Sequence, residues 1–427
     1  MHIVIIPSEF YVPDFKPTAG IFQQDHARLF REKGHQVGVL SLKPRFTLFE
    51  FLRALVGKTN VRTNVSRIEL LTIFFRTILL PKSRLMKEEL IENVPVFRYS
   101  GSYGLIWYDN SELISSFWTK CEKVALAAYI DKYGTPDIIH AYNAMYAGNA
   151  ILNNSTIFQI PFVLTEGSSE HLMRRMTKSA KLIAKKSFEK TNFTTSVSPF
   201  VGRQLEKLYD LEENKFKWLP NMMDIQFEKI KIKNEGQNQK FTFLNVANLI
   251  PLKGQKELIH AFAKTFKGDK NVQLRIVGKG VLLDELKGLS ISLNVAEQLT
   301  FCGFLNRNEV LNEMIQCDIF VFPSHYETFG VVLIEAAAVG KPFIASNCGG
   351  PNCIVNKDNG MLVEPKNIDD LGNAMKYMKS NIQDYNPHII KQDIVRRFGK
   401  EAFYRNVMKE YEVCIHDYHY RLRSREH

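Results

Sequence analysis

The sequence lacks the cysteine patterns that mark disulfide-rich or zinc-binding proteins. Its six cysteines form no Cys-x-x-Cys pair and have no matching His or Cys pair, so neither a disulfide framework nor a metal site is expected. The N-terminal MHIVIIPSEF has neither a basic start nor a small-residue cleavage site, and we interpret it as a strand rather than a signal peptide. Reduced thiols in a cytoplasmic protein are the simplest interpretation.

Long hydrophobic runs are also missing. A membrane-spanning helix needs about 20 apolar residues, and the most apolar stretch, residues 68–80, is shorter and contains Glu69 and Arg76. Short internal repeats and low-complexity tracts do not occur. What remains is an ordinary globular composition of 427 residues, 45% hydrophobic and 24% charged. A chain of this length usually forms two domains of roughly 200 residues each.

Positive charge is the strongest bias in the composition. The net charge of +11 suggests a polyanionic partner or an anionic membrane surface. Lysine and arginine concentrate in residues 43–98 and 171–190. A basic stripe on a predicted helix contains Arg174, Lys178, Lys181 and Lys185. A solvated helix face explains the stripe, and contact with lipid headgroups or an anionic acceptor is the alternative. Nucleic acid is not expected, because no recognised binding module accompanies the charge.

Strands alternate with helices twice along the chain. The predicted strands cover residues 2–6, 35–41, 136–142, 161–166, 192–198, 241–247, 272–278, 299–304, 318–324 and 342–347. Such alternation predicts parallel sheets covered by helices, with ligands at the carboxyl ends of the strands. We therefore predict an α/β protein with two doubly wound, Rossmann-like domains, residues 1–220 and 221–400, followed by a mostly helical segment, 401–427.

Loops at the strand ends of the second domain carry a lysine and several glycines. Lys253 and Gly254 precede a predicted helix, whose first N–H groups favour an anion. Gly278 and Gly303 end the next two strands. Taken singly, each is better explained as a surface lysine or an ordinary turn glycine.

The stretch HYETFGVVLIEAAAVG (325–340) carries two carboxylates. Glu327, on the loop, can reach a sugar hydroxyl. Glu335 lies in a helix that otherwise looks buried, and a ribose diol would satisfy it with two charge-assisted hydrogen bonds. A structural carboxylate paired with a cation or with backbone amides is the alternative. Backbone N–H groups that suit a diphosphate or sugar oxygens are expected at Thr328, Phe329, Gly330 and Val331.

Together these residues resemble a known family. The stretch FPSHYETFGVVLIEAAAVGKPFIAS, followed by CGGP, resembles the E-x7-E signature of retaining GT-B glycosyltransferases of family 4, with Glu327 and Glu335 as the two glutamates. The segments LPNMMD, LIPLKG and DNGMLVEP resemble further motifs of that family. The resemblance is specific over about residues 195–400 and looser before them.

The resemblance implies transfer of a hexose from a nucleotide sugar, such as a UDP- or GDP-hexose, bound mainly by the second of two domains that face each other across a cleft. Glu327 would contact the donor sugar, Glu335 the ribose and Lys253 the diphosphate. Neither a metal nor a prosthetic group is implied for this fold, and the chain has no paired-aspartate motif in a metal-site context. The resemblance also explains why no catalytic base is obvious, because the leaving phosphate can accept the acceptor's proton. The acceptor, a polysaccharide or lipid-linked saccharide, would dock on the first domain, to which the C-terminal helix (about 401–427) would return.

The chain departs from the family pattern at several positions. Asn248 replaces an arginine that grips phosphate, and a neutral amide is the weaker contact. The usual Gly-Gly of the first domain is Ala-Gly, which leaves Gly20 for close approach. Where His-x-His is common, this chain has His140 and Tyr142, so Tyr142 could replace the sugar-facing histidine and His140 could be a packed strand residue.

Other residues expected on the acceptor side follow the strand at 161–166. They are Glu166, Ser168, Ser169 and Glu170, and Gly167 stands where many relatives have histidine. Two alternatives to this enzyme remain open: a catalytically degenerate GT-B subunit that scaffolds a polysaccharide assembly complex, and a same-fold enzyme such as a nucleotide-sugar epimerase or a sucrose-phosphate-type synthase. Peripheral contact with the inner face of the plasma membrane is a further expectation from the basic segments.

Overall fold

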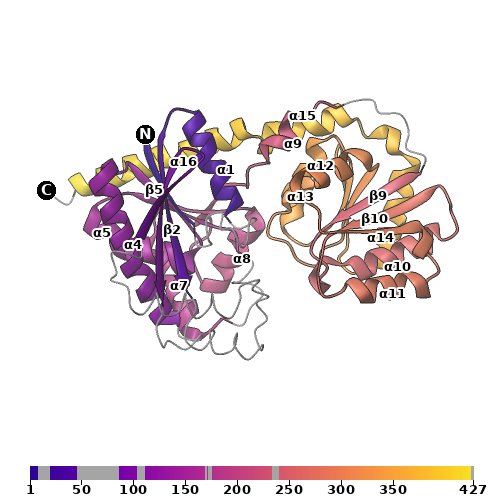
Figure 1. Ribbon diagram of the computed structural model, residues 1–427, viewed down its shortest axis with the longest axis horizontal. Helices are drawn as coiled ribbons and strands as arrows, with labels where there is room; N and C mark the ends of the chain where they lie inside the picture. Colours follow the sequence, from indigo (N-terminus) through magenta and orange to yellow (C-terminus); the bar gives the residue numbers. More distant parts are fainter. Residues whose placement is uncertain are drawn as a thin grey trace. The chain divides into compact units, whose positions relative to one another are not determined.

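The computed structural model describes residues 1–7, 20–45, 86–102, 111–168, 171, 176–232 and 240–424. These residues form two compact units (Figure 1). The N-terminal unit comprises Met1–Val197, Gly202–Leu219 and Tyr404–His427, and the C-terminal unit comprises Ser198–Val201 and Pro220–Phe403. Most of the first basic segment, together with Ser169, Glu170 and Arg174, lies outside the described residues.

The sheet of the N-terminal unit has the strand order β3-β4-β2-β1-β5-β6-β7-β8. Its strands are β1 (His2–Ile6), β2 (Gln36–Arg45), β3 (Met86–Ile91), β4 (Val94–Ser102), β5 (Ile138–Tyr142), β6 (Phe162–Glu166), β7 (Thr194–Ser196) and β8 (Phe216–Trp218). Neighbouring strands are parallel except at the edge, where β3 pairs antiparallel with β4. The strand order reverses between β1 and β5.

Helices cover the faces of this sheet. They are α1 (Ile21–Glu32), α4 (Ser111–Tyr133), the π-helix η2 (Ala144–Gly148), α5 (Asn149–Phe158), α7 (Lys178–Lys190), α8 (Pro199–Tyr209) and α16 (Lys400–Arg423). Because right-handed crossovers change face where the strand order reverses, α1 lies opposite α4, α5 and α7. None of the helices in the described ranges is long and apolar enough to cross a membrane, and all six cysteines are free thiols.

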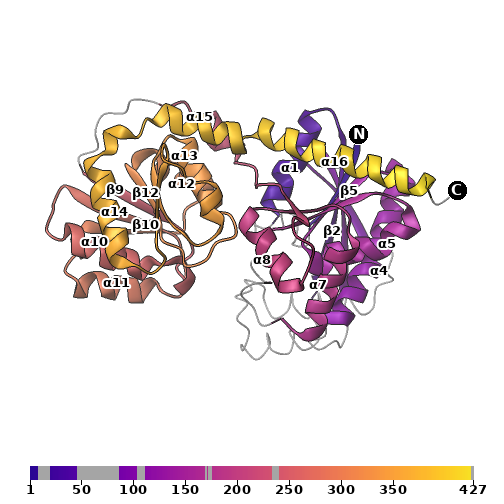
Figure 2. The same cartoon turned by 180° about the vertical axis from the view of Figure 1, so that it is seen from behind.

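The helix α16 packs on the N-terminal unit through its aromatic residues. The Tyr404 hydroxyl lies 2.7 Å from His35 Nε2, and the Tyr411 hydroxyl lies 2.7 Å from His140 Nδ1 on β5. Figure 2 shows this helix in yellow beside the strands of the unit. The last long helix of the chain is therefore part of the unit that contains the first strand.

The C-terminal unit contains a fully parallel sheet with the order β11-β10-β9-β12-β13-β14. Its strands are β9 (Phe241–Val246), β10 (Val272–Val277), β11 (Leu299–Gly303), β12 (Ile319–Phe322), β13 (Phe343–Ser346) and β14 (Gly360–Val363). The strand order reverses between β9 and β12. In such sheets ligands bind outside the carboxyl ends of the strands at the reversal, so the loops after β9 and β12 are the first place to look for a site.

Helices surround this second sheet as well. They are α9 (Ile225–Lys229), α10 (Gln255–Phe266), α11 (Leu283–Ser292), α12 (Arg307–Gln316), α13 (Val331–Ala338), α14 (Ile368–Ser380) and α15 (Pro387–Phe398), with the short 3-10 helix η5 (Gly350–Cys353) after β13. A buried cluster that includes Phe243, Phe262 and Met375 joins the sheet to α10 and α14. Both units are doubly wound around parallel strands, which confirms the predicted fold class.

Local sequence explains where the helix α12 begins. The side chain of Asn306 accepts hydrogen bonds from the N–H groups of Asn308 and Glu309, and the Glu309 carboxylate accepts one from the Asn306 N–H at 2.7 Å. This reciprocal capping box satisfies N–H groups that have no partner within α12. The start of the helix is therefore encoded in four consecutive residues.

Candidate active site

The loops after β9 and β12 bring two opposite charges together. Lys253 Nζ lies 2.6 Å from Glu327 Oε2, and the two side chains are 19% and 18% exposed. The Lys253 ammonium also lies 5.6 Å from the centre of the Phe322 ring at the end of β12. Because water is partly excluded, this ion pair is less screened than one on the open surface. It stands where the strand order reverses.

The loop that carries Glu327 is held by its own backbone and by a neighbouring turn. The Thr328 N–H donates to Glu327 Oε1 at 3.0 Å, so both carboxylate oxygens have a partner. The Gly350 N–H donates to the Glu327 carbonyl at 2.8 Å, and the Ser198 hydroxyl donates to the Thr328 carbonyl at 2.6 Å. The sequence predicts that the Thr328 N–H serves a ligand, whereas in the structure it orients the Glu327 carboxylate.

Two glycines let the surrounding backbone segments approach closely. Gly254 has φ 68°, and a Cβ there would lie 2.0 Å from the Pro323 carbonyl oxygen. A Cβ at Gly350 would lie 2.3 Å from the Phe329 nitrogen. No side chain fits at either position without displacing the loops that carry Lys253 and Glu327.

The helix α13 follows this loop and carries the second glutamate. Its N-cap, Gly330, has φ 105°. Leu333 and Ile334 are buried, whereas Val331 and Glu335 are half-buried. Residues four apart share one face of a helix, so Val331 and Glu335 lie on the less buried face. This explains how the apolar run accommodates a carboxylate.

The other predicted donor-binding residues lie at the ends of β9, β10 and β11. Asn248 is exposed, and its backbone carbonyl accepts a hydrogen bond from Gln255 Nε2 at 3.1 Å. The Gly278 N–H donates to the Gly303 carbonyl at 2.8 Å. Phe329, by contrast, is 1% exposed and packs inside the unit. These strand-end loops are thus tied to one another, and their contact with a donor stays a prediction.

In the N-terminal unit, His140 and Tyr142 are buried in a hydrogen-bond network. The Tyr142 hydroxyl lies 2.6 Å from His26 Nδ1, and His140 contacts the hydroxyl groups of Tyr411 and Thr165 at 2.7 and 2.6 Å. Burial, assisted by the nearby His26, lowers the pKa of His140 well below its usual value, so its imidazole is neutral. The sequence predicts both residues on the acceptor side, and the structure gives them internal partners.

Glu166, at the end of β6, is fully buried and well satisfied. It accepts hydrogen bonds from the N–H groups of Ala144 and Ser168, each at 2.9 Å, and lies 3.1 Å from His171 Nε2. Burial tends to raise the pKa of Glu166, but the charge of His171 and these hydrogen bonds outweigh it and lower the pKa. Gly20, the remaining predicted residue, is the buried N-cap of α1 with φ 71°.

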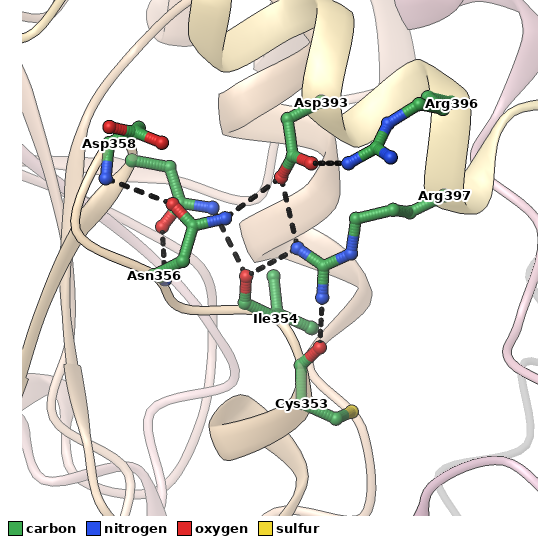
Figure 3. Close-up of polar contacts among 8 residues, drawn as sticks. Cys353, Ile354, Asn356, Asp358, Asp393, Arg396 and Arg397 are labelled. Atoms are coloured by element: carbon green, nitrogen blue, oxygen red, sulfur yellow. Dashed lines mark hydrogen bonds and ion pairs between the residues drawn. The ribbon is translucent and has the colours of Figure 1, made fainter.

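Sequence reasoning missed contacts that join distant segments. Ser198 reaches the Glu327 loop across 130 positions of sequence. Arg397, on α15, binds the carbonyls of Cys353 and Ile354 at the C-terminal end of η5 (Figure 3). Neither residue has a local signal, because a serine after a strand and an arginine near a helix end are common everywhere.

Most of the C-terminal unit matches a known family of sequences. Residues 226–392 match the family model described as glycosyl transferases group 1. This segment belongs to the glycosyl transferases group 1. This group 1 domain contains Lys253, Glu327 and Glu335.

Individual relatives of the chain are also named as glycosyltransferases. An uncharacterised glycosyltransferase of Methanocaldococcus jannaschii is 27% identical over 306 residues, which cover 67% of this chain and 77% of the relative. A GDP-mannose-dependent α-(1-6)-phosphatidylinositol monomannoside mannosyltransferase of Mycobacterium tuberculosis is 30% identical over 142 residues, which cover 31% of this chain and 37% of that protein.

A solved structure confirms the fold over nearly the whole chain. HepE from Anabaena, in complex with UDP, superposes with a TM-score of 0.65 over 97% of this chain and 100% of its own, at 17% identity. Identity at this level shows the fold alone. The two units therefore have the GT-B fold.

Proposed function

We propose that this protein is a retaining family 4 glycosyltransferase that moves a hexose from a nucleotide sugar to a polysaccharide or lipid-linked saccharide, without a metal or prosthetic group. The Lys253–Glu327 pair, 2.6 Å apart at the strand-order reversal, is the observation that carries the proposal. An activated sugar offers a diphosphate for the ammonium and sugar hydroxyls for the carboxylate. The UDP of the HepE structure and the GDP-mannose of the mycobacterial relative support a UDP- or GDP-hexose donor.

The three charged residues have separate tasks in this proposal. Lys253 stabilises the charge that develops on the departing diphosphate. Glu327 fixes the hexose, because Thr328 and Lys253 already hold its two carboxylate oxygens in one orientation. Glu335 accepts from the ribose hydroxyls. The leaving phosphate takes the proton of the acceptor hydroxyl, so catalysis rests on positioning and charge stabilisation.

The remaining donor contacts in the proposal come from the strand-end loops of the group 1 domain. They are Asn248, Gly254, Gly278, Gly303, Thr328, Phe329, Gly330 and Val331. The N-terminal unit takes the acceptor, near the carboxyl ends of β1, β5 and β6. Its proposed residues are Gly20, His140, Tyr142, Glu166 and Ser168; the buried ones shape this region through the backbone that they hold.

Release of nucleoside diphosphate from a panel of UDP-, GDP-, ADP- and TDP-sugars tests the proposal. Glu335→Gln should raise the donor KM about ten-fold, since hydrogen bonds to a charged group contribute about 1.5–3 kcal/mol. Glu327→Ala should lower kcat about a hundred-fold. Glu297→Gln, at an exposed acidic residue in the same unit, is the control and should match the wild type. Wild-type donor kinetics in both glutamate variants would refute the assignment.

The same panel separates the proposal from its alternatives. A scaffolding subunit would release no nucleoside diphosphate from any donor while forming a stable complex with other proteins. An epimerase would convert the donor without an acceptor, and a sucrose-phosphate-type synthase would use a soluble sugar. Activity should persist in EDTA, and its loss there would show that a divalent cation takes part.

For the N-terminal unit we propose peripheral contact with an anionic membrane on the cytoplasmic side, through α7. Lys178, Lys181 and Lys186 are exposed on this helix, and Leu182 is 66% exposed beside them. A cavity of about 440 Å³ lies between α4, α5 and α7, and Lys120 and Lys186 are among its lining residues. Exposed lysines next to an apolar side chain suit headgroups of anionic lipids.

Flotation with vesicles of phosphatidylglycerol and phosphatidylcholine tests this contact. The wild type should float with the anionic vesicles, and high salt should reduce the floated fraction. Changing the three exposed α7 lysines to glutamine should abolish flotation. A control triple variant changes exposed lysines of the other unit: Lys287, Lys357 and Lys376. Equal flotation of both triple variants would disprove a role for α7.

A further inference from the structure

Side chains of α15 bind the turn that follows η5 (Figure 3). The Arg397 guanidinium donates through NH1 to the Ile354 carbonyl at 3.0 Å and through NH2 to the Cys353 carbonyl. These two carbonyls lie at the C-terminal end of η5, where a helix leaves its last acceptors unpaired. Arg397 therefore caps this short helix from another element, and with an exposed fraction of 24% it does so largely out of water.

Arg397 is itself fixed in place. Asp393, one turn earlier on α15, accepts a hydrogen bond from Arg397 NH1 at 3.0 Å and one from Asn356 Nδ2 at 2.9 Å. Burial tends to raise the pKa of Asp393, but Arg396, Arg397 and Asn356 outweigh it and lower the pKa, so the carboxylate stays ionised. A planar guanidinium with partners on two sides has little freedom to move.

The short helix η5 also holds the loop that carries Glu327. At the other end of η5, the Gly350 N–H donates to the Glu327 carbonyl at 2.8 Å, and Gly349 pairs with Glu327 in an isolated parallel bridge. The backbone at Gly350 approaches Phe329 so closely that a Cβ would lie 2.3 Å from its nitrogen. A shift of η5 is therefore a shift of Glu327.

A second route joins the same two places through aromatic rings. The Arg397 guanidinium lies 4.7 Å from the centre of the Phe398 ring. That ring packs edge-on against Phe329, with centroids 5.6 Å apart and an angle of 74°. Phe398 and Phe329 are each 1% exposed. Close-packed interiors transmit small displacements, so both the backbone route and the ring route connect Arg397 to the loop.

We propose that Arg397 is a positioning residue for Glu327: it holds η5, and η5 fixes the loop so that the carboxylate meets the donor sugar. This inference rests on the proposed function, which gives Glu327 its role at the hexose. Arg397 uses both terminal nitrogens on carbonyls and on Asp393, and so acts through the loop. Misplacement of a reacting group by about 1 Å can cost roughly a hundred-fold in rate.

The test compares Arg397→Met with Arg396→Met. Arg396 is the matched control, because it neighbours Arg397 on α15 and also binds Asp393, at 2.8 Å, but is 73% exposed. Arg397→Met should lower kcat at least ten-fold, with donor KM within about two-fold of the wild type and the Kd for UDP unchanged. Arg397→Lys, which can still reach one carbonyl, should recover part of kcat. Arg396→Met should match the wild type.

A double-mutant cycle with Glu327→Gln shows whether the effect passes through the carboxylate. The kcat of the double variant Arg397→Met/Glu327→Gln should be no less than about half the kcat of Glu327→Gln alone. Full additivity, or a kcat of Arg397→Met equal to that of Arg396→Met, would overturn the inference. If Arg397→Met does not fold, Arg397→Lys decides: wild-type kcat in that variant would also overturn it.

The two proposals fail in different ways. If the wild type releases no nucleoside diphosphate from any donor, the proposed function itself is wrong. If the wild type is active and Glu327→Gln is impaired while Arg397→Met is not, only the role of Arg397 is wrong.

Discussion

Glu166 and Glu122 are buried carboxyl groups of the same unit with pKa shifts of opposite sign. The pKa of Glu166 is lowered, because His171 and two backbone N–H groups outweigh the cost of burial. The pKa of Glu122 is raised well above its usual value by burial, and a single hydrogen bond from Asn154 opposes this. One carboxyl is thus held ionised and the other neutral in the folded unit.

These shifts predict opposite pH dependences of stability. Folded Glu166 binds its proton less tightly than in the unfolded chain, so its stabilisation is present above the ordinary carboxyl pKa and is lost as the pH falls through the lowered one. Glu166→Gln should therefore cost most near neutral pH and least in acid. Folded Glu122 binds its proton more tightly, so stability is lost as the pH rises toward its raised pKa.

Urea denaturation at several pH values between about 3 and 8 measures both effects, and each variant is the other's control. Relative to the wild type, Glu122→Gln should gain stability as the pH rises, while Glu166→Gln should lose it. Parallel curves for the two variants would contradict the assigned shifts.

At this scale the sequence predicts residues for the chemistry of the group 1 domain, and their roles stay predictions. How these residues are arranged did not follow from the sequence. Lys253 and Glu327 were assigned to the diphosphate and the sugar, yet their 2.6 Å contact joins residues 74 positions apart and has no local signal. His140 was left open as a packed strand residue, and it is indeed buried. Elements cover both faces of β5, so polar residues on this strand are buried too, and the sequence pattern of the strand does not reveal this.

The loop between β9 and α10 depends on one glycine for its course. Gly254 combines φ 68° with an approach of 2.0 Å between a built Cβ and the Pro323 carbonyl oxygen. Gly268, after α10, has a similar φ of 83° but no atom within 4 Å of a built Cβ. The two positions share the backbone strain that a side chain brings and differ only in crowding.

Alanine at each position separates strain from crowding. Gly268→Ala should cost about 1–2 kcal/mol, the penalty of the left-handed conformation. Gly254→Ala should cost more and should also raise the donor KM, because the loop must move and Lys253 moves with it. Chemical denaturation and donor kinetics measure the two effects. Equal costs with unchanged kinetics would show that the loop absorbs the methyl group.

Strands with a strong hydrophobic pattern could be predicted from the sequence. The edge strand β3 and the packing partner of the last helix could not. The alternation of apolar strands and helices predicted β5, β6, β9, β10 and β12 close to their observed bounds, because buried parallel strands are continuous apolar runs. The antiparallel edge strand β3 was missed, since MKEELI is half polar and reads as helix or loop. The packing partner of α16 did not follow from its pattern, which shows amphipathic character but not what lies against it.

At the scale of the whole molecule, α16 completes the core of the N-terminal unit. Val407, Tyr411 and Cys414 are at most 2% exposed, and the Cys414 thiol approaches the Phe162 carbonyl at 3.5 Å. Removal of residues 404–427 would uncover these contacts along β5 and β6. The C-terminal unit, by contrast, has its own sheet and core.

Calorimetry of a chain truncated after Phe403 should therefore lose the cooperative transition of the N-terminal unit. The transition of the C-terminal unit should remain and should still rise in temperature with added UDP, since a ligand stabilises the unit that binds it. A chain that lacks only residues 424–427 is the control and should keep both transitions. An unchanged N-terminal transition after the longer deletion would show that α16 is dispensable for that core.

The N-terminal unit is built from segments that are far apart in the sequence. This sets the order in which the two units can fold during synthesis. Residues 220–403 are contiguous and can complete their core as soon as they leave the ribosome, while the unit that is translated first must wait for α16, the last helix to emerge. Until then, the surface of β5 and β6 that α16 covers is exposed to chaperones and proteases, so the unit that is made first matures last.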